Sequence, residues 1–327
     1  MLLAGDVGGT NARLALFDAP PPADPVEIAI YSSAGYVGLA ELLDTFVDGR
    51  TVSRASFGVA GPVQGGTVEG VNLAWDVDGE EIASHLGLAG VGLLNDLEAN
   101  AWGIAALGAA DFAVINEGVA VEGGNAAVIS AGTGLGEAGL LWNGQRYVPF
   151  ATEGGHADFA PRTEQEVRLW RSLGGETRHV SVESVCSGEG LVSVFEFLLS
   201  EDGEEAPGWL AEARGTGGAP AQISVHAIDG NDERAGRALE LMVSVYGAEA
   251  GNLALVTMAT AGIYVGGGIA PKILPVIEDG TFMDAFCAKG RLEPLLADIP
   301  VRVILNDLTA LYGAALHAAS HEPARSS

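Results

Sequence analysis

The chain has 327 residues, 48% of them hydrophobic, and its 43 acidic and 16 basic residues give a formal net charge of −27. This length and apolar content predict a globular protein of one large or two moderate domains with a sizeable core. The acidic excess argues against nucleic acid or anionic membranes as partners, and two cysteines are too few for a disulfide framework or a four-thiolate zinc site.

The N-terminus lacks the basic segment of a signal peptide, and Asp6 interrupts its short apolar run. The best candidate for a membrane span, Leu253 to Val265, is short and is interrupted by polar residues. We therefore expect a cytoplasmic protein with neither a membrane nor a nucleic-acid partner.

The first third of the chain alternates between strand and helix patterns. An apolar strand enters the turn Gly8-Gly9-Thr10-Asn11, and a second apolar strand leaves it. Such a hairpin can bring backbone N–H groups close to an anion, and Asp6 beside it is suited to a hydrated Mg²⁺ ion. The alternative is an ordinary hairpin.

Strand patterns cover residues 1–6, 12–17, 55–60, 67–71 and 91–95, and helical patterns cover 38–47, 79–86 and 97–107.

Asn95-Asp96 follows the apolar run of the last of these strands and precedes a helix. The carboxyl end of a strand is where open α/β sheets place ligand chemistry. The alternative is a helix N-cap, a position that both residue types favour. The two roles can also be divided, with Asn95 capping or binding and Asp96 facing a ligand.

A second glycine hairpin lies at residues 126–142. Its turn contains Gly132, Thr133 and Gly134, and residues 128–142 repeat the strand, turn and strand plan of residues 3–17. The repeat predicts two related α/β lobes, each with a phosphate-binding turn. The pattern Gly134-x-Gly136-x-x-Gly139 resembles a dinucleotide fingerprint, but a strand and not a helix follows it, which argues against that fold.

In the second half, Glu153-Gly154-Gly155-His156 places a carboxylate and an imidazole on one turn, a pair that suits vicinal sugar hydroxyls. The alternative is an exposed Glu and a structural His. Gly266-Gly267-Gly268 after a buried strand would let a flat ring approach the backbone, or would form a tight turn.

We expect Cys186 to be buried and His317 to belong to the C-terminal tail. Helices are expected over 164–173, 189–199, 232–258 (capped by Asn231) and 308–319, strands over 145–148, 263–265 and 301–305, an exposed loop or helical connector over 201–220, and a disordered tail over 320–327.

Taken together, the chain resembles the bacterial glucokinase family, within the sugar kinase–actin–Hsp70 superfamily, over residues 3 to 317. The motifs that carry the resemblance are GDVGGTNARLAL (5–16), NDLEA (95–99), AGTGLG (131–136), EGGHADFAP (153–161), VSVESVCSGEGL (180–191), GNLAL (251–255) and VGGGIAPK (265–272). The family often has proline where Glu189 stands, a position away from the expected chemistry.

The resemblance implies a two-domain actin-like ATPase (ribonuclease H-like) α/β fold with an interdomain cleft. It implies a small domain of residues 1–106 plus 302–327, a large domain of residues 107–301, and a homodimer. The implied activity is Mg-dependent transfer of phosphate from ATP to the 6-hydroxyl of D-glucose, which feeds glycolysis. The alternatives are a kinase for another hexose, such as mannose or an N-acetylated amino sugar, or a non-catalytic sugar-sensing regulator.

The resemblance also assigns roles to residues. Asp96 is the implied catalytic base, and the implied glucose-binding set is Asn95, Asp96, Glu153, His156 and Glu183. The implied nucleotide contacts are Asp6 (through a Mg-bound water), Gly8, Gly9, Thr10, Asn11, Gly132, Thr133, Gly134, Gly266, Gly267 and Gly268.

Overall fold

The computed structural model describes residues 1–69 and 75–320, and the strand expected over 67–71 and the tail expected over 320–327 lie partly outside them. The chain groups into two compact units: unit 1 holds residues 1–111, 148–151 and 306–327, and unit 2 holds residues 112–147 and 152–305. Each unit is described by itself. The domain boundaries expected from the sequence stay a prediction, since grouping by contacts does not test which segments fold together.

Unit 1 is built on a five-stranded sheet of order β3-β2-β1-β4-β7. β1 and β2 are antiparallel across the first glycine turn, whereas β4 runs parallel to both β1 and β7. The carboxyl ends of β1, β4 and β7 therefore meet at one edge of the sheet. The strands are β1 (Leu2–Val7), β2 (Asn11–Phe17), β3 (Glu27–Ser32), β4 (Arg54–Val59) and β7 (Gly92–Asn95), and β5 (Thr67–Val68) pairs with β6 (Val77–Asp78) in a separate ribbon.

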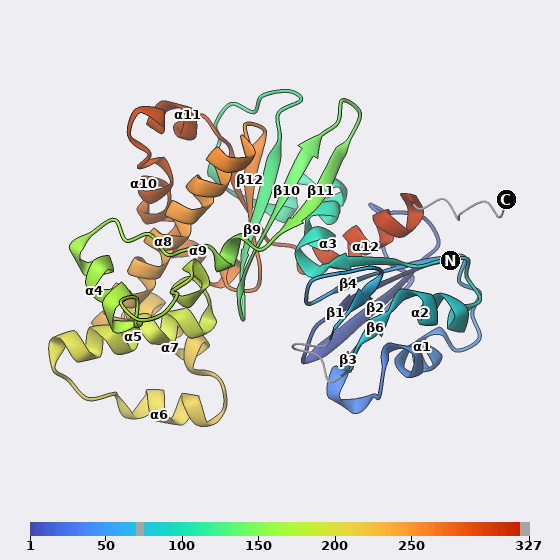
Figure 1. The fold of residues 1–327 in the computed structure, drawn as a ribbon, viewed down its shortest axis with the longest axis horizontal. Helices are drawn as coiled ribbons and strands as arrows, with labels where there is room; N and C mark the ends of the chain where they lie inside the picture. The colour runs from blue at the N-terminus through green and yellow to red at the C-terminus, as the bar shows by residue number, and fades with distance from the viewer. Residues whose placement is uncertain (70–74, 321–327) are drawn as a thin grey trace. The chain divides into compact units, whose positions relative to one another are not determined.

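The alternation of side chains along these strands gives the sheet two apolar faces. Leu3 and Val7 pack with α1 (Leu39–Val47) and α2 (Gly79–Leu86). Leu2 and Ala4 pack with α12 (Thr309–Ser320), which also lies against α3 (Asp96–Gly103). Helices therefore cover both faces of this sheet, as Figure 1 shows for the blue strands.

Unit 2 is built on a six-stranded sheet of order β11-β10-β9-β12-β13-β8. Counted from β9, its first five positions hold strands in the order third, second, first, fourth and fifth. This is also the order of β1, β2, β3, β4 and β7 in unit 1, and β8 is added at the edge of the second sheet. The internal repeat predicted from the two glycine hairpins is thus confirmed in the strand order. The strands are β8 (Phe112–Asn116), β9 (Ala126–Ala131), β10 (Leu135–Trp142), β11 (Tyr147–Thr152), β12 (Gly262–Gly266) and β13 (Val301–Ile304).

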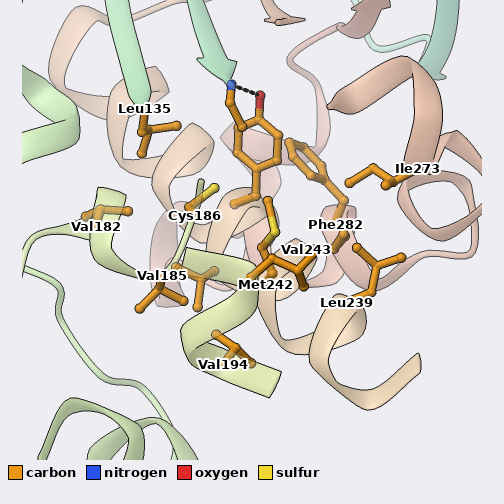
Figure 2. Packing of buried hydrophobic residues seen from close by; sticks show 14 of the residues in the cluster. Leu135, Val182, Val185, Cys186, Val194, Leu239, Met242, Val243, Ile273 and Phe282 are labelled. Carbon is orange, nitrogen blue, oxygen red and sulfur yellow. Dashed lines mark hydrogen bonds between the residues drawn. The ribbon is translucent and has the colours of Figure 1, made fainter. Parts of the chain in front are cut away.

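One apolar cluster forms the core of unit 2. Figure 2 shows Cys186, Met242 and Phe282 packed within it, and the predicted burial of Cys186 is confirmed. Among the described residues one helix, α8 (Glu233–Thr257), is long and apolar enough to cross a membrane by length and composition, a match that the sequence analysis missed. Its buried side chains pack in this core, which accounts for its apolar character. The other helices are α4 (Glu164–Ser172), α5 (Gly188–Asp202), α6 (Gly208–Gly215), α7 (Ala219–Ile228), α9 (Leu274–Glu278), α10 (Thr281–Cys287) and α11 (Glu293–Ala297).

The helical connector expected over 201–220 is confirmed, because that segment contains α6 and the start of α7 and is mostly exposed. Three other expectations need correction. Asp232, not Asn231, caps α8, because its carboxylate accepts the N–H groups of the first helical turn. Strand β3 was not anticipated. His317 is not a tail residue, because its Nδ1 lies 2.9 Å from the hydroxyl of Ser56 and its ring packs edge-on against Trp102.

Candidate functional site

The first glycine turn is a closed hairpin loop in unit 1. The N–H of Gly8 donates to the carbonyl of Asn11 at 2.9 Å, while Gly9, Thr10 and Asn11 are exposed. Ser33, which is fully buried, stabilises the loop through two hydrogen bonds. Its hydroxyl donates to the Gly8 carbonyl at 2.7 Å, and its N–H donates to the Thr10 carbonyl at 3.0 Å. The turn is therefore held in a fixed shape with its tip accessible.

Asp6 lies at the carboxyl end of β1, opposite Arg13 in the β1–β2 register, and is half-buried. Burial raises the pKa of the Asp6 carboxyl, and the nearby Arg13 guanidinium opposes this rise. Arg13 donates to the main-chain carbonyl of Asp307 at 2.6 Å. Mg²⁺ prefers one or two carboxylates and keeps several waters, so a single half-buried carboxylate beside an exposed glycine turn fits that ion. Within residues 1–69 and 75–320 no group of three or more potential ligand side chains gathers, and a water-mediated site needs none.

Asn95 and Asp96 stand at the same edge of the sheet as Asp6. The register aligns Val7 with Val59, and Val59 with Asn95. Asn95 caps α3, since its Oδ1 accepts from the Leu97 N–H at 2.8 Å, and its Nδ2 donates to the Gly61 carbonyl. Asp96 Oδ1 also accepts from the Leu97 N–H, at 3.0 Å. The cap predicted for Asn95 is confirmed, and the structure brings Asp6, Asn95 and Asp96 to one edge of unit 1.

The second glycine turn is tied to unit 2 from several sides. The Gly132 N–H donates to the Gly134 carbonyl at 2.8 Å, and the Gly188 N–H at the start of α5 donates to the Gly132 carbonyl at 2.9 Å. A Cβ added at Gly132 would meet no atom of the protein within 4 Å. Nothing inside the chain thus requires glycine at this position, which fits a ligand that approaches the backbone closely.

The loop Gly266-Gly267-Gly268 leaves β12 next to the second turn. A Cβ at Gly267, where φ is +83°, would overlap the carbonyl oxygen of Ala131, whereas one at Gly268 would meet no protein atom within 4 Å. The bases of the two loops share one fully buried side chain, Tyr246 of α8. Its hydroxyl accepts from the Ala131 N–H at 3.1 Å and lies within hydrogen-bonding distance of the Ile129 carbonyl, at 3.2 Å.

The turn Glu153-Gly154-Gly155-His156 forms a short 3-10 helix in which Glu153 and His156 are exposed. Its glycines allow close packing, because a Cβ at Gly155 would overlap the carbonyl of Leu135 and one at Gly154 would overlap the carboxylate of Glu137. The turn is therefore pressed against β10, where that strand leaves the second glycine turn.

Glu183 reaches the same place from the segment between α4 and α5. Its Oε2 accepts from the Leu135 N–H at 2.8 Å, and a Cβ at Gly134 would overlap this oxygen. Thr133 and Glu183 line one cavity of about 380 Å³ in unit 2. The structure thus brings the second turn, the third glycine loop, the 153–156 turn and Glu183 together in unit 2.

Glu137, two residues beyond Leu135, is a buried acid that sequence reasoning did not single out. Its side chain is 4% exposed, and among the described residues its Oε1 is buried without a hydrogen-bond partner. Burial, with a smaller effect of the nearby Glu249 carboxylate, raises its pKa to about 8. Sequence reasoning could have identified Glu137, because a charged residue is unusual within the apolar pattern of a central strand.

Known proteins are similar to this chain in both sequence and fold. A family model described as Glucokinase matches residues 3–321 of the chain. The chain is 39% identical over 338 residues to a glucokinase of Nostoc sp., covering 98% of this chain and 99% of that protein. A glucokinase structure from an Antarctic psychrotroph matches with a TM-score of 0.84 at 30% identity, covering 98% of this chain and 99% of that one. A ROK family glucokinase from Streptomyces griseus, solved with glucose and AMPPNP, shares the fold with a TM-score of 0.67 at 22% identity, covering 98% and 99% of the two chains.

Proposed function

Since the chain belongs to the glucokinase family and is a hexose kinase that phosphorylates glucose, we propose that the residues described above carry out this transfer from ATP to the 6-hydroxyl. The observation that carries the proposal is the repeated strand order, with a glycine turn between β1 and β2 in unit 1 and between β9 and β10 in unit 2. Two such turns present two sets of backbone N–H groups, which suits a chain of phosphates.

On the donor side, the first and second glycine turns bind the phosphates and the third glycine loop accepts the adenosine. The open space around Gly132 and Gly268 supports these assignments, because a ligand is what would fill it. With so few basic residues in the chain, the phosphates depend on backbone dipoles and a metal for charge neutralisation. Asp6 holds Mg²⁺ through water in this proposal, and the ion supplies further neutralisation of the phosphate charge.

On the acceptor side, Asn95, Asp96, Glu153, His156 and Glu183 bind glucose. The O6 oxygen forms a bond to the γ-phosphorus while the bond from that phosphorus to the bridging oxygen of ADP breaks. Asp96 accepts the O6 proton late in this step, because an alcohol is too weak an acid to ionise beforehand. The hydrogen bond from the Leu97 N–H to Asp96 Oδ1 holds the carboxylate in one orientation for that transfer.

Three further statements belong to the same proposal. The enzyme works as a homodimer in the cytoplasm, and its product feeds glycolysis. The resemblance of the motifs to the glucokinase family supports these statements.

A coupled assay for glucose 6-phosphate tests the function. Glucose, mannose and N-acetylglucosamine are compared as acceptors, with ATP, ADP and polyphosphate as donors. We expect the highest kcat/KM for glucose with ATP. Higher kcat/KM for another hexose would overturn the assignment of the preferred substrate, and sugar binding without turnover of any acceptor would identify a sensor instead.

A further inference from the structure

We propose that Glu183 is a positioning residue for the second glycine turn, and that its carboxylate couples sugar binding to nucleotide binding within unit 2. The inference rests on the proposed function, because it uses the assignments of Glu183 to the sugar and of residues 132–134 to the phosphates. It adds a role for Glu183 that exists before any sugar is present.

Leu135 follows the second glycine turn directly. Its N–H donates to Glu183 Oε2 at 2.8 Å, and Gly134 lies so close to the same oxygen that no Cβ would fit. A hydrogen bond to an ionised carboxylate is stronger than one between neutral groups. Glu183 thus fixes the exit of the second turn, and a Cβ at position 134 would require this carboxylate to move.

The entry of the turn is fixed from the same segment of chain. The Gly188 N–H donates to the Gly132 carbonyl at 2.9 Å. Between the two contacts, the Ser187 hydroxyl donates to the Glu183 carbonyl at 2.8 Å, which closes the segment on itself. Residues 183–188 therefore hold both ends of the second turn as one unit.

The carbonyl side of Leu135 faces the other part of the sugar site. Gly155 lies against the Leu135 carbonyl with no space for a Cβ. One residue, Leu135, therefore connects the phosphate turn to Glu183 through its N–H group and to the 153–156 turn through its carbonyl. Glu183 and Thr133 also line the same cavity.

Sugar binding and nucleotide binding can be coupled because the Glu183 carboxylate can accept several hydrogen bonds at once. Its two oxygens offer about four acceptor positions, so a sugar hydroxyl and the Leu135 N–H can be bound together. A hydroxyl bound at Glu183 restricts this side chain in the orientation that holds Leu135, so the nucleotide meets an ordered turn. By linkage, each ligand then increases the affinity of the other by the same factor.

The test is calorimetric titration of Mg-ADP into the full-length protein, with and without glucose. The variants are Glu183→Ala, Glu183→Gln and, as the matched control, Glu122→Ala, which removes an exposed carboxylate that precedes β9. Without glucose we expect Glu183→Ala to weaken Mg-ADP binding about tenfold. Glu183→Gln keeps an acceptor for the Leu135 N–H and should stay within about threefold of the unaltered protein. Glu122→Ala should leave this affinity unchanged.

With glucose present, the unaltered protein should bind Mg-ADP more tightly, and Glu183→Ala should lose this gain. Thermal melts establish that each variant is folded, and recovery of affinity in Glu183→Gln separates positioning from general damage. An unchanged Mg-ADP affinity in folded Glu183→Ala would overturn this inference alone. Failure of the unaltered protein to bind Mg-ADP or to phosphorylate glucose would instead count against the proposed function.

Discussion

Replacing Glu137 by glutamine should change how the stability of unit 2 depends on pH. The carboxyl is 4% exposed and its pKa is about 8 in the folded protein, against an ordinary value of 4.5. The folded state thus holds a proton that the unfolded chain releases between these two values. Stability from this group is fully present below pH 4.5 and is lost as the pH rises toward 8.

The size of the effect follows from the shift. One pKa unit corresponds to about 1.4 kcal/mol, so the group costs about 3 kcal/mol of unfolding free energy at pH 7 relative to pH 4.5. Glutamine stays neutral throughout and removes this dependence. Its amide has hydrogen-bonding needs of its own, but that cost is the same at every pH. The diagnostic quantity is therefore the slope of stability against pH and not its level.

Urea unfolding followed by tryptophan fluorescence, at intervals from pH 5 to pH 8, measures this slope. The free-energy difference between Glu137→Gln and the unaltered protein should change by about 4 kcal/mol over the range, with the variant gaining as the pH rises. Glu122→Gln, at an exposed position, is the matched control and should follow the unaltered protein. Parallel curves for Glu137→Gln and the unaltered protein would refute the reasoning.

Three substitutions probe the proposed site directly. Asp96→Asn should lower kcat by roughly 10²- to 10⁴-fold while glucose affinity measured by calorimetry is retained; a near-normal kcat would exclude Asp96 as the base. Asp6→Asn should raise the KM for Mg-ATP more than the KM for glucose in steady-state kinetics, and equal changes in both would argue against its metal role. Gly268→Ala should leave the thermal midpoint unchanged, because its Cβ meets no protein atom, yet raise the KM for ATP; an unaltered KM would remove Gly268 from the adenosine contacts.

Much of the fold could be predicted from local sequence because its signals are local. Both hairpins have glycine turns between apolar runs, and both match the observed strands β1–β2 and β9–β10. The helix expected over 164–173 is observed as α4, and the Thr163 side chain accepts from the Glu166 N–H at its start. These patterns depend on a few neighbouring residues, so burial elsewhere does not alter them.

The missed elements depend on contacts that are distant in the sequence. Strand β3 is an edge strand with Val26 and Ile30 largely exposed nearby, so its apolar residues do not show the buried face that marks a strand. The cap of α8 was placed one residue early because Asn231 and Asp232 are both good caps, and only the backbone geometry distinguishes them.

The same limit applies to the site. The glycines and acids of the proposed site were identifiable from their motifs, but the residues that hold them in place were not. Ser33 lies 25 residues from Gly8, and Tyr246 lies 115 residues from Ala131. A serine after a strand and a tyrosine within an apolar helix have no distinctive pattern, so only the three-dimensional structure reveals what they support.

The shared strand order gives both units a similar contact beside the glycine turn. Ser33, after β3, donates to the carbonyl of Thr10, and Gly155, after β11, packs against the carbonyl of Leu135. In unit 1 the contacting segment fixes the turn through a buried serine, whereas in unit 2 it is a turn with exposed acid and imidazole groups. Corresponding segments of the two sheets thus serve rigidity in one unit and display polar side chains in the other.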